Sequence, residues 1–343
     1  MRVAIVGATG LVGEMMRRVL EERDFPLTDL VLLASQRSRG SKQRFKGEWH
    51  KVRGVSPAAF NGVDIALFAT EAELSREYAA AAARAGAVAI DNSSAFRMDK
   101  DVPLVVPEVN PGDLKRHNGI IANPNCSTIQ LVVILWPIHE SYRLERVVVS
   151  TYQSVSGKGK DALTELANQM DSYRANLEAI PYSLVPRVKG SVFKYPIISN
   201  IIPQVDVFVD GDHTREEEKM VNETRKIMGL PGLRIAVTCV RVPVLFSHCE
   251  SVNLETEKRA DPAKVKRLLS RSQSVEVIDS PRSEQYPLPL GAADSDKVFV
   301  GRIRRDPSVP KGLAMWIVSD NLRKGAATNA VQIAEKLLDL GLL

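Results

Sequence analysis

Cysteine is scarce in this chain, which has only Cys126, Cys239 and Cys249 in 343 residues. So few cysteines exclude a disulfide framework and favour a reducing, intracellular setting. Long apolar runs are also missing. No stretch is long enough to span a membrane, and glycines interrupt the apolar N-terminal run too early for a signal peptide. We therefore expect a cytoplasmic protein without a membrane partner.

Charge of one sign is not concentrated anywhere along the sequence. The 46 basic and 41 acidic residues are scattered and leave a net charge of +5, whereas a nucleic-acid-binding protein would cluster its basic residues. Histidines and cysteines do not occur with metal-site spacing. We expect neither a nucleic-acid partner nor a metal. The hydrophobic fraction of 44% is that of a globular protein, and the length favours two domains.

The first third of the chain alternates short β-branched runs with helical patterns. Expected strands are Arg2–Val6, Leu30–Ala34, Asp64–Ala69 and Ala87–Asp91, and expected helices are Val12–Glu22 and Glu73–Ala85. This alternation predicts an α/β, doubly wound domain with a parallel sheet and helices on its faces.

Around Asn123–Cys126 the pattern changes, and strands become more frequent. Expected strands are Arg146–Ser154, Ile235–Val242, Ser247–Glu255, Val298–Arg304 and Leu313–Ser319, and expected helices are Ser127–His139, Asp161–Tyr173, Thr214–Met228 and Ala326–Leu340. This pattern predicts an α+β domain with a mixed or antiparallel sheet. We expect residues 1–125 to form the first domain and 126–320 the second, with residues 321–343 packing back on the first.

A glycine loop follows the first strand. In "VAIVGATGLVG", Gly7, Gly10 and Gly13 lie between an apolar strand and a helix start. Such glycines let backbone amides approach a pyrophosphate at the positive end of the helix. Glycines that serve tight turns alone are the alternative, but the position inside a strand-helix-strand unit favours a dinucleotide site.

The end of the second strand indicates which dinucleotide the protein binds. It reads "ASQRSRG", with Arg37, Ser38 and Arg39 and without the carboxylate that would bind a free ribose 2′-hydroxyl. Guanidinium and hydroxyl groups suit a 2′-phosphate, so NADP is favoured as the cofactor. The alternative is an ordinary exposed basic loop.

Cys126 is the candidate nucleophile. It lies in "IIANPNCSTIQLVVIL", where a polar loop meets a buried helix, and the helix amides there would lower a thiol pKa. Cys239 lies in an apolar strand pattern that favours core packing. Cys249 adjoins His248, but neighbouring residues of a strand point to opposite faces. Spacing alone does not connect His248 with Cys126.

Nine segments together resemble one family. They are "VAIVGATGLVG", "ASQRSRG", "DNSSAFRMDKDVPLVVPEVN", "IIANPNCST", "VSTYQSVSGKG", "TREEEKM", "TCVRVPVLFSHCESV", "FVGRIRRD" and "VSDNLRKGAATNAVQIAE". This set resembles bacterial aspartate-β-semialdehyde dehydrogenase from residue 1 to about residue 335, and several of the motifs are specific to that family.

The resemblance implies a Rossmann-type NADP-binding domain joined to a catalytic and dimerisation domain like that of glyceraldehyde-3-phosphate dehydrogenase. It implies reversible conversion of aspartate 4-semialdehyde, phosphate and NADP to 4-aspartyl phosphate and NADPH through a cysteine thioester. This step belongs to lysine, threonine, methionine and diaminopimelate biosynthesis. It also implies a homodimer or homotetramer.

Residue roles follow from the same resemblance. Cys126 is the nucleophile, His248 the acid/base, and Gln153 orients the substrate and the thioester. Arg241 would bind the substrate carboxylate and Glu216 its amino group, while Arg97 and Lys219 would bind phosphate. The implied cofactor contacts are Gly7, Thr9, Gly10, Leu11, Val12, Arg37, Ser38, Ser156, Gly157 and Asn321.

The sequence departs from the family in two places. "FATEAELSREYA" replaces a small glycine- and serine-rich loop near the cofactor, and Lys158 is larger than the usual residue. Two alternatives remain open: a related acyl-phosphate or acyl-CoA reductase, and a non-catalytic paralogue that binds NADP. A free amino group and a carboxylate on the substrate would require both Glu216 and Arg241. A silent protein would have no chemical need for the catalytic set.

Overall fold

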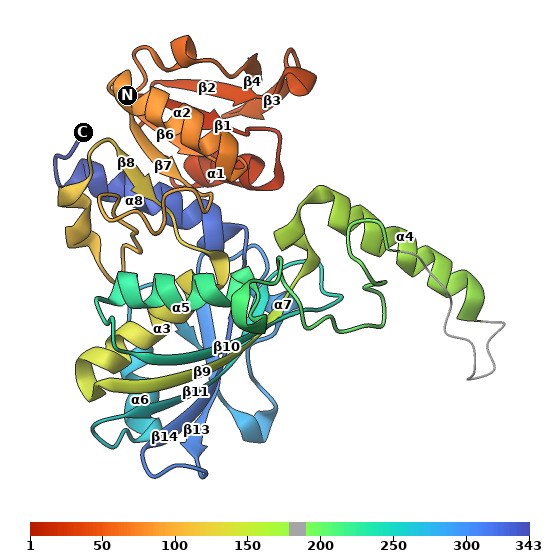
Figure 1. Cartoon of the computed structure of the whole chain (residues 1–343), viewed down its shortest axis with the longest axis vertical. Helices are drawn as coiled ribbons and strands as arrows, with labels where there is room; N and C mark the ends of the chain where they lie inside the picture. The colour runs from red at the N-terminus through yellow and green to blue at the C-terminus, as the bar shows by residue number, and fades with distance from the viewer. Residues whose placement is uncertain (178–189) are drawn as a thin grey trace.

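The computed structural model describes residues 1–177 and 190–343. Two six-stranded sheets dominate this part of the chain, one above the other in Figure 1. The first sheet has the order β5-β2-β1-β6-β7-β8, and every pairing in it is parallel. Its strands are β1 (Arg2–Val6), β2 (Asp29–Ala34), β5 (Arg53–Gly54), β6 (Ile65–Phe68), β7 (Val88–Asp91) and β8 (Ile120–Ala122).

Both faces of the first sheet are buried, as parallel sheets require. In β1, Val3 and Ile5 enter one apolar cluster while Ala4 and Val6 enter the other. Helices on these faces are α1 (Leu11–Glu22), α2 (Ala72–Arg84) and α8 (Thr328–Asp339). The strand order reverses between β1 and β6, and in such folds ligands bind beyond the strand ends at the reversal. The doubly wound fold expected from the sequence is confirmed.

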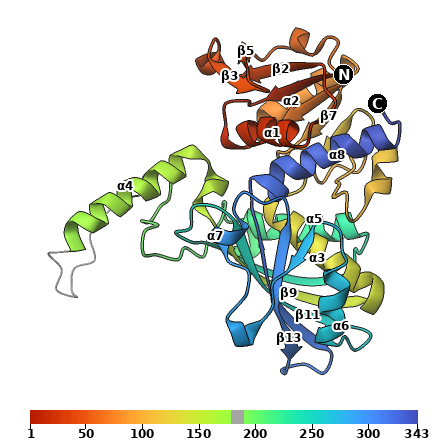
Figure 2. The same ribbon diagram turned by 180° about the vertical axis from the view of Figure 1, so that it is seen from behind.

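The second sheet is mixed, with the order β10-β9-β11-β14-β13-β12. The outer pairs β10-β9 and β13-β12 are parallel, and the pairs between them are antiparallel. The strands are β9 (Leu144–Gln153), β10 (Arg234–Arg241), β11 (His248–Thr256), β12 (Val275–Val277), β13 (Val298–Asp306) and β14 (Gly312–Ser319). Helices α3 (Cys126–Tyr142), α5 (Arg215–Met228) and α6 (Pro262–Leu269) lie along one face (Figures 1 and 2).

Helix α3 is apolar on nearly every side because it is buried throughout most of its length. Its residues join the same core cluster as the inner face of the second sheet and one face of the first. The opposite face of the second sheet carries a smaller cluster that contains Cys249 and Phe299, beside the short helix α7 (Pro289–Ala292).

The end of the chain returns to the first sheet. A π-helical turn, η7 (Arg323–Ala327), leads into α8, whose Val331 and Leu337 join the cluster of α1 and β1. Arg323 pairs with Glu22 of α1 and with Asp294 and Asp296, so it ties the first sheet's helix to the segment before β13.

The remaining elements are short or peripheral. They are the hairpin β3 (Lys42–Phe45) and β4 (Glu48–Lys51), the long helix α4 (Lys160–Leu177), and the short turns η1 (Gln36–Ser38), η2 (Pro57–Phe60), η3 (Pro111–Arg116), η4 (Val155–Lys158), η5 (Asp210–Asp212) and η6 (Pro281–Ser283). Helix α4 projects sideways from the body of the molecule (Figures 1 and 2). Among the described residues, no helix is both long and apolar enough to cross a membrane.

Candidate active site

One edge of the second sheet brings together strand ends that carry candidate residues. β9 ends at Gln153 and β10 ends at Arg241, and these two residues are partners in the parallel register. β11 runs antiparallel to β9 and begins at His248. The start of α3, with Cys126, lies at the same edge. This follows because Asn125, the residue before Cys126, and Gln153 both donate hydrogen bonds to the Glu216 carboxylate.

The first turn of α3 is capped by Asn125. Its side-chain oxygen accepts hydrogen bonds from the amides of Ser127 and Thr128, at 2.9 and 3.3 Å. Cys126 is thereby held as the first helical residue. Gly325 of η7 faces it closely, since a Cβ on that glycine would lie 3.0 Å from the Cys126 Cβ. Asn125 was not among the expected site residues.

The pKa of the Cys126 thiol differs from the sequence-based expectation. Although the residue is partly exposed, burial of its thiol raises the pKa to about 12, and the Glu216 carboxylate raises it further. Arg241, Arg97 and the Ser127 amide act in the opposite direction. The expectation of a lowered pKa is therefore wrong, because desolvation outweighs the helix amides.

His248 is fully buried and is held through Nδ1, which accepts a 3.1 Å hydrogen bond from the Ser154 amide. That donor leaves the proton of the neutral ring on Nε2, which has no partner among the described residues. Burial, and next the charge of Arg241, lower the pKa of His248 to about 3. The imidazole is therefore neutral at physiological pH.

Glu216, in the first turn of α5, contacts three polar side chains of the site. Its Oε1 accepts from Asn125 Nδ2 at 2.8 Å and from Gln153 Nε2 at 3.3 Å. Its Oε2 lies 3.4 Å from Lys219 Nζ, which also pairs with Asp206 at 2.7 Å. The carboxylate thus lies next to the residue that precedes the thiol.

Arg97 is bound on the other side of Asn125. Its Nη1 pairs with Glu223 Oε1 at 3.0 Å, and Glu223 Oε2 accepts from the Asn125 amide at 2.7 Å. Nε and Nη2 donate to the carbonyls of Asn123 and Asn92. Each terminal nitrogen keeps a second N–H that none of these bonds uses. Glu223 was missed because only a contact 98 residues distant in the chain reveals it.

Arg241 and His248 share a wall formed by Gly157. A Cβ on that glycine would lie 3.2 Å from Arg241 Nη1 and 3.3 Å from His248 Nε2. Arg241 donates from Nη1 to the Ser154 carbonyl at 2.6 Å and is buried. A side chain at residue 157 would therefore crowd the working atoms of both residues.

The glycine loop is shaped for close backbone approach. Gly7 has φ +85°, and a Cβ there would lie 2.2 Å from the Ala69 carbonyl. A Cβ on Gly13 would lie 2.2 Å from the Gly7 carbonyl. The helix that begins with Leu11 and Val12 has Gly10 at its N-cap and no side chain bonded to its first amides. Unpaired amides at a helix start fit a pyrophosphate.

The basic segment after β2 reaches this loop. Thr9 Oγ1 donates to Ser38 Oγ at 3.2 Å, so the two expected cofactor residues are in contact. Arg37 is exposed, and its guanidinium bonds no other described residue. The structure thus brings the glycine loop and a free guanidinium to the same end of the first sheet.

Asn321 connects the two parts of the site. Its Oδ1 accepts from Ser154 Oγ, Ser156 Oγ and the Ser247 amide at 2.9 to 3.2 Å. These bonds hold the turn that carries Gly157 beside the start of β11. Ser154 was missed, although its place directly after Gln153 was the available signal.

The two departures from the family differ in burial. The unusual segment after β6 becomes the start of α2, where Thr70 and Ser75 bond each other at 3.0 Å. Lys158 is exposed in η4. The neighbouring Lys160 connects the start of α4 with the glycine loop and α1, since its Nζ bonds the Thr9 carbonyl at 3.1 Å and Glu14 at 2.7 Å.

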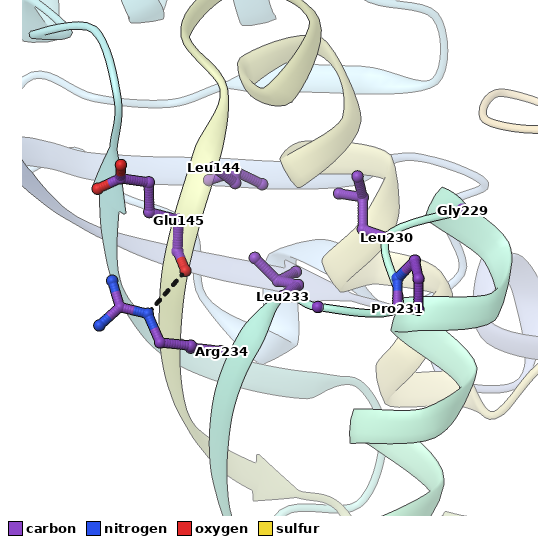
Figure 3. A pocket seen from close by; sticks show the side chains of 8 residues that line it. Leu144, Glu145, Gly229, Leu230, Pro231, Leu233 and Arg234 are labelled. Atoms are coloured by element: carbon purple, nitrogen blue, oxygen red, sulfur yellow. Dashed lines mark hydrogen bonds between the residues drawn. The ribbon is translucent and has the colours of Figure 1, made fainter.

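A hollow of about 430 Å³ lies elsewhere, between the start of β9 and the end of α5 (Figure 3). Leu230 and Leu233 line it, and Arg234 bonds the Glu145 carbonyl at its edge. It contains no candidate residue. In the described parts of the chain, no group of three His, Cys, Asp or Glu side chains could hold a metal ion.

Comparison with known proteins agrees with the motifs. The family model for the semialdehyde dehydrogenase NAD binding domain matches residues 2–117, and that for the semialdehyde dehydrogenase dimerisation domain matches residues 135–324. The aspartate-semialdehyde dehydrogenase of Aquifex aeolicus is 51% identical over 100% of this chain and 99% of its own length.

Solved structures give the same result. Aspartate semialdehyde dehydrogenase II of Vibrio cholerae, complexed with ASA, superposes with a TM-score of 0.92 at 47% identity over 98% of both chains. The Candida albicans enzyme with NADP has a TM-score of 0.75 at 25% identity, covering 100% of this chain and 99% of its own. The chain belongs to the aspartate-semialdehyde dehydrogenase family.

Proposed function

We propose that this protein is an NADP-dependent aspartate-semialdehyde dehydrogenase that works through a thioester on Cys126. The observation that carries the proposal is the convergence of Cys126, Gln153, Glu216 and Arg241 at one sheet edge, beside a dinucleotide loop. In the biosynthetic direction the enzyme would reduce 4-aspartyl phosphate to aspartate 4-semialdehyde, for lysine, threonine, methionine and diaminopimelate synthesis.

The substrate would bind as a zwitterion between Glu216 and Arg241. A carboxylate suits an ammonium group, and the planar guanidinium offers a fork to a carboxylate. Both side chains exert their charge on the Cys126 thiol, so both lie near the place where the reacting carbon must sit. An acyl-CoA reductase would have no use for the pair.

In the oxidative direction the Cys126 sulfur would attack the aldehyde carbon, and the proton lost by the thiol would end on the carbonyl oxygen, giving a hemithioacetal. The Nε2–H of His248 is suited to bond that oxygen. With the ring proton on Nδ1 instead, bonded to Ser154 Oγ at 3.1 Å, Nε2 would take up the hydroxyl proton as the hydride leaves. Bound NADP supplies the acceptor for that hydride. Burial lowers the pKa of His248 most and the charge of Arg241 next, so a substrate carboxylate on Arg241 would offset only the second cause and make the ring a stronger base in the complex.

Phosphate would then attack the thioester and release 4-aspartyl phosphate. Arg97 and Lys219 are its proposed ligands. Arg97 keeps unused N–H groups, whereas Lys219 is paired with Asp206 and Glu216 and would have to exchange a partner.

For the cofactor, we propose NADP rather than NAD, with the glycine loop on the pyrophosphate, Arg37 and Ser38 on the 2′-phosphate, and Ser156, Gly157 and Asn321 near the nicotinamide. The free guanidinium of Arg37 supports this choice. We also propose that residues 1–125, with 321–343, form the cofactor domain, that 126–320 form the catalytic domain, and that the protein is a homodimer or homotetramer.

The deciding experiment measures NADP reduction by aspartate 4-semialdehyde with and without phosphate. We expect turnover only with phosphate or arsenate, and a single burst of at most one NADPH per Cys126 without it. Multiple turnovers without any such anion would contradict the proposal. For the cofactor, Arg37→Asp should reverse the NADP preference, and Arg37→Ala should remove only part of it because Arg39 can share the contact with the 2′-phosphate.

A further inference from the structure

Behind the proposed catalytic side chains lies a second layer of polar residues: Gln130, Thr151 and Glu250. We call it the rear layer. Glu250 follows His248 by two residues on β11, so both point to the same face of the sheet. Thr151 precedes Gln153 by two residues on β9 in the same way.

The third member comes from the helix. Gln130 follows Cys126 by four residues on α3 and therefore lies on the same side of that helix, one turn further on. Each of the three proposed catalytic residues thus has a polar residue directly behind it. All three members of the rear layer are at most 1% exposed.

The rear layer is in contact with the catalytic layer. Glu250 and Thr151 are partners in the antiparallel register of β11 and β9. Thr151 Oγ1 accepts a 3.4 Å hydrogen bond from Gln153 Nε2. The Gln130 side chain on α3 lies close enough to the Glu250 carboxyl group on β11 to lower its pKa. Helix α3 and strand β11 therefore adjoin at this carboxyl group.

Glu250 is unusual because its surroundings do not compensate a charge. It is 0% exposed, and neither carboxyl oxygen has a hydrogen-bond partner of full geometry among the described residues. No arginine or lysine in the described chain forms an ion pair with it. An isolated buried carboxylate is strongly disfavoured, and such groups stay protonated. Burial accordingly raises the pKa of Glu250 to about 8.

The other titratable groups around Glu250 do not reverse the rise in its pKa. His248, on its own strand, is neutral. Cys126 on α3, Cys239 on β10 and the neighbouring Cys249 have raised thiol pKa values.

The charged residues packed nearby are Arg241 on β10 and Glu216 and Glu217 on α5. They act on Cys126, Cys239 and His248, and Glu250 itself raises the pKa of Cys239 and Cys249, but none of the three is a cause of the Glu250 shift. Glu250 is therefore the group whose ionisation would add a new anion behind the thiol.

We propose that Glu250 is a positioning residue of the active site that works in its neutral, protonated form and sets the alkaline limit of catalysis. This rests on the proposed function. As an acid, Glu250 can donate to the oxygen atoms of Gln130 or Thr151 and so fix the side chains behind Cys126 and Gln153. As an anion it loses that proton and opposes the Cys126 thiolate in a low-dielectric interior.

The experiment compares wild type with Glu250→Gln, which has the same shape, an N–H donor and no proton to lose. Glu255→Gln is the matched control, since it lies on the same strand in a partly exposed pair with Arg146. kcat/KM for aspartate 4-semialdehyde is measured from pH 6 to 10. We expect similar values for all three proteins at pH 7. At pH 9.5, E250Q should exceed wild type and the control by roughly tenfold, the usual scale for two coupled buried charges.

A second measurement needs no substrate. The rate at which iodoacetamide modifies Cys126, followed by mass spectrometry of its peptide, should rise more steeply with pH in E250Q than in wild type. If wild type fails to oxidise the semialdehyde, the proposed function is wrong, but the alkylation rates still test Glu250. Glu250→Met, also neutral, serves if E250Q does not fold.

Two results would overturn the inference. One is superimposable pH profiles for wild type and the neutral variants in both measurements. The other is a folded E250Q that loses activity equally at pH 7 and pH 9.5, because that would mean the charged carboxylate is the working form.

Discussion

Replacing Asn125 should separate two contributions that meet at the start of α3. Its side-chain oxygen caps the helix at Ser127 and Thr128, and its amide nitrogen donates to Glu216 at 2.8 Å. Loss of an N-cap costs about 1 kcal/mol, within a range of roughly 0.5–2 kcal/mol. Loss of a hydrogen bond to a charged acceptor costs about 1.5–3 kcal/mol. Asn125→Ala removes both, so we expect a destabilisation of about 3 kcal/mol.

Two further variants divide this total. Asn125→Ser keeps a capping oxygen but has no amide donor for Glu216, so it should lose roughly two thirds as much as Asn125→Ala. Asn125→Asp keeps the cap but places a second carboxylate against Glu216. It should therefore be less stable than the serine variant, even though aspartate is itself a good N-cap. The kcat should be lowest in the alanine variant, because that variant has no capping oxygen and the turn that holds Cys126 loosens.

Thermal unfolding by calorimetry is the assay. An unfolding entropy of about 2.1 cal/mol/K per residue means that 1 kcal/mol shifts the Tm of a chain of this length by roughly 1.4 °C. Asn125→Ala should therefore lower Tm by about 4 °C. A shift below about 1 °C, or equal shifts for the alanine and serine variants, would refute the division into cap and donor.

Three other changes have definite expected outcomes. Cys126→Ala should abolish turnover, whereas Cys249→Ser should keep most of it because that thiol packs on the far face of the sheet; the reverse result would disprove the assignment. Arg241→Lys should raise KM for the semialdehyde by roughly tenfold or more and leave NADP binding by calorimetry unchanged, since lysine lacks the fork. Lys324→Met should destabilise by about 3–5 kcal/mol, because it leaves the buried Glu108 carboxylate without the ammonium 2.7 Å away. A melting temperature equal to that of wild type would contradict this.

The expected secondary structure agrees well where apolar periodicity is strong. β1, α1 and α2 begin and end within about one residue of the sequence-based ranges. The hairpin of β3 and β4 escaped notice because its strands are polar, although Lys46 and Gly47, both at positive φ, form the kind of turn that links such strands. Helix α6 also went unpredicted, despite the capping Asp261 before Pro262.

The candidate site was predicted less completely, for a physical reason. The parity of β11 correctly separates Cys249 from His248, because side-chain direction in a strand is a local property. Glu223 and Gly325 depend on contacts between distant segments, which local patterns do not reveal. The thiol pKa of Cys126 was predicted with the wrong sign because the helix start is visible in the sequence, but its desolvation is not.

The charges around Cys126 bear on how a thiol with a high pKa can serve as a nucleophile. Glu216 opposes the thiolate, whereas Arg241 and Arg97 favour it. In the proposed complex, the substrate ammonium pairs with Glu216 and the substrate carboxylate pairs with Arg241. The substrate therefore neutralises the effect of each of these side chains on the thiol pKa. Arg97 then remains as the cation acting on the sulfur, and His248 loses the repulsion of Arg241. Burial still raises the thiol pKa in that complex, so the zwitterion would remove only the part of the rise that Glu216 causes.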